Sequence, residues 1–166
     1  CLFVQSITPK NMAKPLKYYS AEEERLNVLT HGFGFILSIL ATIFLILKAQ
    51  SSQVDYAISS FITFGLSLSV LYAASTLYHK ATNPSVRAKL KIFDHAAIYV
   101  LIAGTYTPFT LITLQGNIGW CIFFIVWGLA LAGIVLKVFF AGRFKIISTL
   151  MYVGMGWIIV FAAKPM

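Results

Sequence analysis

Five long apolar runs constrain this chain more than any other feature. A helix that crosses the hydrocarbon core of a bilayer needs about 20 apolar residues, because each residue adds about 1.5 Å to a thickness of about 30 Å. Helix is expected in each run because a lipid-exposed backbone must satisfy its own hydrogen bonds, and the strict alternation of a membrane barrel is absent. The runs cover about residues 28–47, 56–78, 96–114, 118–140 and 146–163. The sequence therefore predicts an all-α, polytopic transmembrane helical bundle.

The charge balance favours a membrane protein over a soluble, nucleic-acid-binding one. Hydrophobic residues make up 59% of the chain and charged residues only 11%, which is too little for the surface of a soluble domain. The 13 Lys and Arg residues outnumber the five acidic ones, but they fall between the apolar runs, so they indicate membrane topology and no nucleic-acid partner. Eleven of them flank the runs on one side, and only Lys48 and Lys164 lie on the other. Because positive loops stay in the cytoplasm, the amino terminus is predicted to be cytoplasmic.

The chain divides into a cytoplasmic segment at residues 1–27 and a transmembrane domain at residues 28–166. Met12 is predicted to be the natural start, so residues 1–11 are expected to be foreign to the native protein. Ser20 and Glu23 fit the S-x-x-E capping box, which predicts a helix start ahead of the first apolar run.

Polar side chains occur where the first three apolar runs reach the predicted cytoplasmic face. Ser75 and His79 lie four residues apart at the end of the second run, and Asp94 opens the third. A charge at the centre of a bilayer costs about 2.5–3.5 kcal/mol on insertion scales, and less near helix ends. On the first run, four residues follow one another at helical spacing and share a face: Asn27, His31, Gly34 and Ser38. The three runs are therefore expected to bring polar groups to one membrane level.

Each of these residues alone has an ordinary structural explanation. A histidine at a helix end is commonly an interfacial residue in contact with water, and Asp94 fits an N-terminal helix cap. His95 points about 100° away from Asp94 around a helix, which favours a structural role for it. Together, imidazole and carboxylate groups suit zinc, with hydroxyl groups orienting the ligands. The residues leave both an interfacial and a metal-binding interpretation open.

Two further features predict how the runs pack. Pro108 interrupts the hydrogen-bond ladder of the third run and is expected to kink it. Gly128 and Gly154 are small enough to let neighbouring helices approach closely.

Three motifs follow one another in register: EERLNVLTHGFGFIL, LYAASTLYHK and KIFDHAAIYVLIAGTYTPF. Together they resemble the hemolysin III family, the bacterial branch of the progestin and adipoQ receptor family. The similarity runs from about Glu22 to the end of the sequence. It implies a seven-helix fold in the bacterial inner membrane, of which five spans are present here, with a cytoplasmic amino terminus.

The resemblance also implies a zinc site near the cytoplasmic face. The histidine of the family's S-x-x-x-H motif is a zinc ligand, and it corresponds to His79. Ser75 and Asp94 correspond to the serine and aspartate that lie close to the metal, which makes them the candidate catalytic residues. His31 matches a histidine with a supporting role. The family completes the ligands with an H-x-x-x-H that this sequence does not contain, so the chain as given is expected to bind zinc only weakly and to be inactive.

Three functions follow from the resemblance. The first is zinc-dependent hydrolysis of lipid amides, with Asp94 as general base or water-positioning group and a lipid substrate. The second is a non-enzymatic role in membrane homeostasis or reception, with zinc purely structural. The third is cytolysis, as the family name suggests. It ranks last, because a pore former usually inserts from a soluble state and this chain carries too many apolar runs. Membrane lipids are the expected partners in each case.

Overall fold

A computed structural model describes residues 19–140 and 145–162, and in these residues it contains helices and no strand. The elements are α1 (Ala21–Gln50), α2 (Ala57–Lys80), α3 (Pro84–Pro108), the π-helix η1 (Phe109–Leu114), α4 (Gly116–Phe139) and α5 (Lys145–Ala162). The all-α prediction is thus confirmed. The predicted start at Met12 and the residues before it lie outside the described residues.

Four stretches are long and apolar enough to cross a membrane. They are α1, α2, α3 continued by η1, and α4. The apolar part of α5 is shorter and covers Ile146–Val160. A polytopic membrane bundle is therefore confirmed, and the fifth span stays a prediction.

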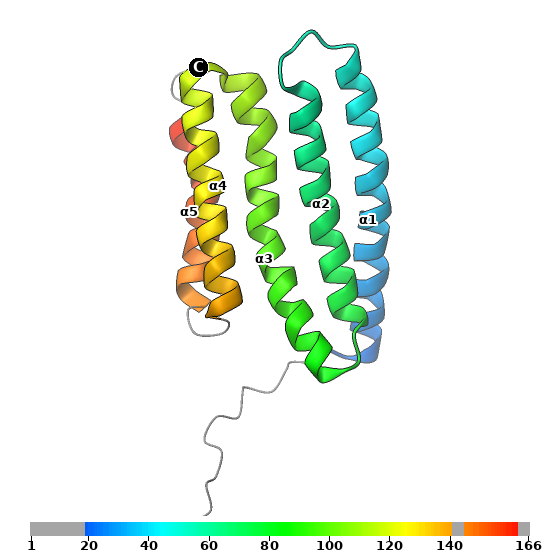
Figure 1. The fold of residues 1–166 in the computed structure, drawn as a ribbon. Helices are drawn as coiled ribbons and strands as arrows, with labels where there is room; N and C mark the ends of the chain where they lie inside the picture. Colours follow the sequence, from blue (N-terminus) through cyan, green and yellow to red (C-terminus); the bar gives the residue numbers. More distant parts are fainter. Residues whose placement is uncertain (1–18, 141–144, 163–166) are drawn as a thin grey trace, which may run out of the picture.

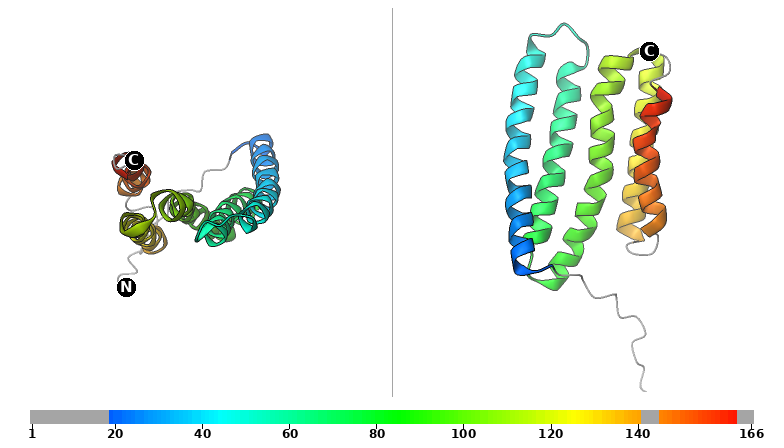
Figure 2. Two further views of the ribbon diagram at one scale, coloured as in Figure 1. Left: turned by 90° about the horizontal axis from the view of Figure 1, so that it is seen from above. Right: turned by 180° about the vertical axis from the view of Figure 1, so that it is seen from behind.

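The helices stand side by side in an open arc. Helices α1 to α4 follow one another in chain order, each antiparallel to the last, and α5 packs on α4 and α3 (Figure 1). Viewed along the helices, α1 lies at one end of the arc and α5 at the other (Figure 2). Among the described helices, α1 packs only against α2. Large apolar side chains along α1 are exposed, which suits a surface in contact with lipid.

The first helix begins where the sequence predicts. The backbone N–H of Glu23 donates to Ser20 Oγ at 3.2 Å, and that of Ser20 donates to Glu23 Oε2 at 2.9 Å. Both halves of the capping box are present, so two of the unpaired N–H groups at the start of α1 are satisfied.

The third helix begins earlier than its apolar run. It starts at Pro84, and Asn83 Oδ1 accepts hydrogen bonds from the next backbone N–H groups. Asp94 therefore lies ten residues inside α3 and is not its N-terminal cap, as one interpretation had it. The charged residues before residue 96 set where the apolar run begins. The helix itself begins earlier, because Asn83 caps it and Pro84 follows, both ahead of the membrane-spanning part.

The hydrogen-bond ladder of α3 changes at Pro108, as expected. The π-helix η1 follows directly, since proline has no N–H to donate within the helix. Threonine hydroxyls add hydrogen bonds here. Thr107 Oγ1 donates to the carbonyl of Ala103 at 3.0 Å, and Thr110 Oγ1 to that of Tyr106 at 2.9 Å.

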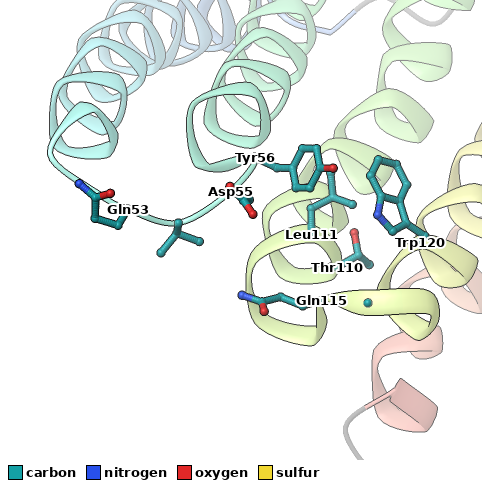
Figure 3. A pocket seen from close by; sticks show the side chains of 9 residues that line it. Gln53, Asp55, Tyr56, Thr110, Leu111, Gln115 and Trp120 are labelled. Atoms are coloured by element: carbon teal, nitrogen blue, oxygen red, sulfur yellow. The ribbon is translucent and has the colours of Figure 1, made fainter.

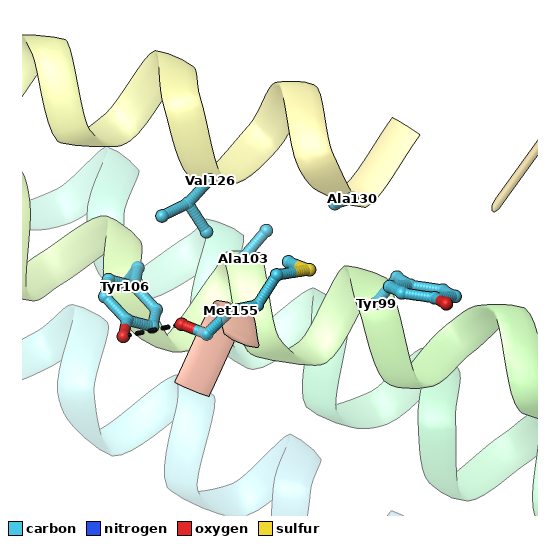
Figure 4. Packing of buried hydrophobic residues seen from close by; sticks show 6 residues of the cluster. All are labelled: Tyr99, Ala103, Tyr106, Val126, Ala130 and Met155. Carbon is cyan, nitrogen blue, oxygen red and sulfur yellow. Dashed lines mark hydrogen bonds between the residues drawn. The ribbon is translucent and has the colours of Figure 1, made fainter. Parts of the chain in front are cut away.

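Two tyrosine hydroxyls tie α5 to α3. The hydroxyl of Tyr99 lies 2.9 Å from Ser148 Oγ, and that of Tyr106 donates to the carbonyl of Met155 at 2.8 Å. The main buried cluster surrounds them (Figure 4) and consists of Tyr99, Ala103, Tyr106, Val126, Ala130 and Met155. Buried hydroxyls need partners, so these bonds fix how α5 sits on α3.

Close helix contacts occur at other glycines than those expected. Gly128 and Gly154 have open space where a Cβ atom would lie. A Cβ atom on Gly133, in contrast, would collide with the ring of Tyr99, which is fully buried. Five residues separate Gly128 from Gly133, so the two lie about 140° apart around α4 and only Gly133 faces α3.

We expect Gly133→Ala to destabilise the protein by about 1–3 kcal/mol, because Tyr99 must move away from its hydrogen bond with Ser148. The matched control is Gly128→Ala, which adds the same methyl group to the same helix in open space and should be neutral or slightly stabilising. Unfolding by denaturant in detergent micelles, followed by helical circular dichroism, measures both. Equal effects of the two substitutions would contradict the packing of α4 on α3.

Candidate functional site around His79

The start of α1, the end of α2 and the start of α3 lie together where these helices end on one side of the bundle, at the bottom of Figure 1. His79 belongs to the last turn of α2. Basic residues gather at this end, as the sequence predicts: Arg25, Lys80, Arg87, Lys89 and Lys91. The predicted separation of charge holds for these residues, whereas Lys10, Lys14, Lys17, Arg143 and Lys164 lie outside the described residues and the orientation toward the cytoplasm stays a prediction.

His79 is held by a carboxylate of another helix. Its Nδ1 lies 2.7 Å from Glu24 Oε2, in the first turn of α1, and 3.4 Å from the amide nitrogen of Asn27. Because an ionised carboxylate only accepts hydrogen bonds, Nδ1 carries the proton in the contact with Glu24. In the neutral imidazole, the other ring nitrogen, Nε2, then keeps its lone pair. Histidines that bind metals commonly donate their second nitrogen to a carboxylate in this way.

Arg87 joins the three helix ends. Its side chain is buried, with 1% of the residue exposed. One nitrogen, Nη2, donates to Glu24 Oε1, and the other, Nη1, lies 3.2–3.5 Å from the carbonyls of Tyr78, His79 and Ala81. The last carbonyls of a helix lack partners within it, so Arg87 caps α2 and neutralises Glu24 with one planar group.

Glu24 lies ahead of the apolar run that begins at Val28, and therefore outside the membrane-spanning part of α1. Burial raises the pKa of its carboxyl group, but hydrogen bonds from His79, from the backbone N–H of Tyr19 and from Arg87 lower it, and the net pKa lies below the ordinary value. A lowered pKa in the folded state stabilises the fold above the unfolded-state pKa, and this contribution is lost as the pH falls through the folded-state value. The Glu24 carboxyl group is therefore ionised at neutral pH, the form that accepts hydrogen bonds from His79 and Arg87.

The polar face predicted on the first run forms the contact between α1 and α2. Asn27 and His31 both contact His79; the His31 and His79 rings stack, with centres 5.9 Å apart and planes 5° apart. Farther along, Ser38 Oγ lies 2.8 Å from Ser69 Oγ. The shared face is confirmed, and it brings His31 beside His79, whereas the supporting role of His31 stays a prediction.

The remaining predicted residues lie on α2 and α3. Ser75 is buried one turn before His79 on α2. Asp94 lies on α3, where its carboxylate is 3.9 Å from Nδ1 of His95. Within residues 19–140 and 145–162, no three His, Cys, Asp or Glu side chains gather closely enough to hold a metal ion. The described residues alone therefore do not supply the three protein ligands that a zinc site usually needs.

His95 has the structural role expected of it. Its Nδ1 lies 2.7 Å from the carbonyl of Lys91, one turn earlier on the same helix. Its own carbonyl accepts a hydrogen bond from the hydroxyl of Tyr152 at 2.8 Å. The first contact lies within α3, and the second joins α5 to α3.

The roles of Glu24 and Arg87 were not predicted from the sequence. Glu24 looks like one of three solvated acids at a helix start, and Arg87 like one of several positive charges near the membrane. One signal was available: Arg87 is the single arginine in a stretch whose other basic residues are lysines. A planar guanidinium binds several oxygens at once, which a lysine does not do as well.

A cavity lies at the opposite end of the bundle from His79 (Figure 3). Its volume is about 390 Å³, and its lining includes Asp55, Tyr56, Gln115 and Trp120. The rings of Tyr56 and Trp120 meet edge to face at 5.4 Å. The cavity contains none of the predicted site residues, so the chemistry expected from the sequence does not belong to it.

We expect Glu24→Gln to weaken the preference of His79 for the tautomer with the proton on Nδ1, because an amide can either donate or accept. Nitrogen NMR of protein labelled with ¹⁵N-histidine reads this directly, with His31→Gln and His95→Gln assigning the signals. The same substitution should cost about 1–3 kcal/mol of stability, since it leaves the buried Arg87 without its counter-charge.

The matched control is Glu22→Gln, an exposed neighbour that removes the same charge from the same helical turn. It should leave the tautomer unchanged. An unaltered His79 signal in Glu24→Gln would show that Glu24 does not set the proton position.

Comparison with known proteins agrees with this architecture. The family described as Haemolysin-III related matches residues 19–166. The chain is 49% identical over 148 residues to a Bacillus subtilis (strain 168) protein named Hemolysin-3 homolog, covering 89% of this chain and 70% of the relative. It is 50% identical over 145 residues to Hemolysin-3 of Bacillus cereus, covering 87% and 66%. The human Monocyte to macrophage differentiation factor is 24% identical over 140 residues, covering 81% and 58%. No solved structure matches significantly.

The two Bacillus matches cover most of this chain at about 50% identity. The chain spans only about two thirds of the length of these relatives. The region matched by the family includes every residue of the cluster around His79. It also includes every apolar helix that the structure describes. The chain therefore belongs to the Haemolysin-III-related family of integral membrane proteins.

Proposed function

We propose that this protein binds zinc within the membrane, with His79 as one ligand near the cytoplasmic face. The observation that carries the proposal is the contact between His79 Nδ1 and the Glu24 carboxylate, which leaves Nε2 to bind a metal. In this proposal the remaining ligands come from outside residues 19–140 and 145–162. The basic residues around the cluster support the cytoplasmic position, and the Bacillus relatives favour a bacterial cell membrane.

For the complete site we propose hydrolysis of lipid amides as the reaction class. Ser75 lies one turn from His79 on the same face of α2, and Asp94 is a partly buried carboxylate on the neighbouring helix. These are the groups that would position or deprotonate water. A lipid substrate is supported by the apolar exposed surfaces of the helices. If zinc is only structural, the same residues would affect stability and there would be no turnover to lose.

Cytolysis is the second candidate, and the name Hemolysin-3 of the Bacillus cereus relative favours it. It requires the protein to reach a target membrane from water. The four long apolar helices oppose this, because a water-soluble state would have to cover them. Dye release from lipid vesicles that His79→Gln leaves unchanged would favour lysis over zinc chemistry.

We expect the purified 166-residue chain to bind zinc weakly and saturably through His79, and to lose it on dialysis against a chelator. His79→Gln should abolish the saturable binding, because it removes the ligand nitrogen. The control His95→Gln, whose ring is hydrogen-bonded within α3, should keep it. Zinc titration in detergent micelles with metal analysis measures each case. Equal binding by His79→Gln and the original chain would exclude His79 as a ligand.

In a zinc-loaded protein with all its ligands, we expect Asp94→Asn to lower turnover of a ceramide-like lipid amide by at least about 100-fold while zinc remains bound. His31→Gln should have a smaller effect, because His31 acts only by stacking on His79. Product release measured together with zinc content separates the two roles. Turnover that persists in Asp94→Asn would remove Asp94 from the reaction.

A further inference from the structure

A cavity of about 370 Å³ lies beside the cluster, between the start of α1 and the last turn of α2. It is lined by Glu24, Arg25, Val28, Leu29, His79 and Lys80. The proposed zinc chemistry accounts for His79 and its carboxylate partner. It gives no role to the two basic side chains or to the apolar wall, and these suggest a ligand of their own.

The two cations give the cavity a surplus of positive charge. Arg25 and Lys80 are exposed, and neither forms an ion pair within the part of the chain that the structure describes. Glu24 is the single acidic residue of the lining. Both of its oxygens are engaged, one by His79 and one by Arg87. A ligand in the cavity therefore meets two uncompensated positive charges, which favour an anion.

An apolar track leads from the cavity toward the middle of the membrane. Val28 and Leu29 form the cavity wall on this side, and Leu29 is 66% exposed. Three more exposed apolar side chains follow Leu29 at helical spacing on the same face of α1: Phe33, Ile36 and Leu40. Since α1 packs only against α2 among the described helices, no other described helix covers this track.

The combination selects a lipid over a free ion. Inorganic phosphate would use only the charged end of the cavity, whereas a phospholipid would place its phosphate there and an acyl chain along the track. The basic end of the bundle is also the level at which headgroups lie. Basic pockets between helices on the cytoplasmic side bind anionic headgroups in other membrane proteins.

We propose that this cavity binds the phosphate-bearing headgroup of an anionic phospholipid, with Arg25 and Lys80 contacting the phosphate and an acyl chain lying along Leu29 and Phe33. Arginine binds phosphate with two parallel hydrogen bonds, and lysine binds it as a point charge. The inference goes beyond the zinc proposal, because it needs neither a metal nor a reaction. It places a membrane lipid directly next to His79.

The test compares phosphatidylglycerol with phosphatidylcholine on the full chain in a neutral detergent, with bound lipid counted by native mass spectrometry. A zinc chelator is present throughout, so the result does not depend on whether His79 binds metal. The chain should retain phosphatidylglycerol saturably and in preference to phosphatidylcholine. The double substitution Arg25→Gln with Lys80→Gln should weaken this retention by about tenfold or more.

The matched control is Lys89→Gln with Lys91→Gln, which removes the same charge from the same end of the protein but outside the cavity lining. It should leave retention within about twofold. We expect both variants to keep their helices, because the substituted cavity residues are exposed, and circular dichroism checks this. If both double substitutions weakened retention equally, the effect would come from net charge alone and the proposal would be overturned. Equal retention of phosphatidylglycerol and phosphatidylcholine would also overturn it.

A further arm separates lipid from free phosphate. Excess inorganic phosphate should displace phosphatidylglycerol only in part, because phosphate gains nothing from the apolar track. Leu29→Ser should weaken the binding of the lipid. Complete displacement by phosphate, together with no effect of Leu29→Ser, would assign the cavity to a free anion and overturn the lipid proposal.

Discussion

The hydrogen bonds of the buried Arg87 guanidinium group hold together the end of the bundle that contains His79. A charge removed from water is costly unless it is paired and hydrogen-bonded. Arg87 meets both conditions, with the carboxylate of Glu24 on α1 and three carbonyls at the end of α2. One side chain of α3 therefore fixes two other helix ends. This matters most for α1, because its backbone packs along α2 alone among the described helices and Arg87 gives it a contact with α3.

The same carboxylate determines the chemistry of His79. Glu24 offers one oxygen to Arg87 and the other to the imidazole, so the charge balance of the cluster and the proton position on His79 are set together. With Glu24 neutralised, the charges of Arg25 and Lys80 remain for an external anion. The proposed metal ligand and the proposed lipid headgroup site therefore share one network of hydrogen bonds.

Much of the fold could be predicted from the sequence because it depends on local properties. Length and hydropathy predict the long helices, the capping box predicts the start of α1, and Pro108 predicts where the ladder of α3 changes. The start of α3 could not be read from hydropathy, since the helix extends into a basic stretch outside the apolar run. The close helix contact at Gly133, and the open space at Gly128, depend on which face of α4 meets Tyr99.

The sequence by itself determined the membrane class, the helices, the end at which positive charge gathers and the place of His79 at a helix end. These features follow from composition and from periodicity within about 20 residues. Only the tertiary structure decided that Glu24 and Arg87, 63 residues apart, share a hydrogen bond, and that the Glu24 carboxylate lies 2.7 Å from Nδ1 of His79. The reason is physical: periodicity specifies which face of a helix is polar, but the partner of a buried charge is chosen by the packing of helices that are distant in sequence.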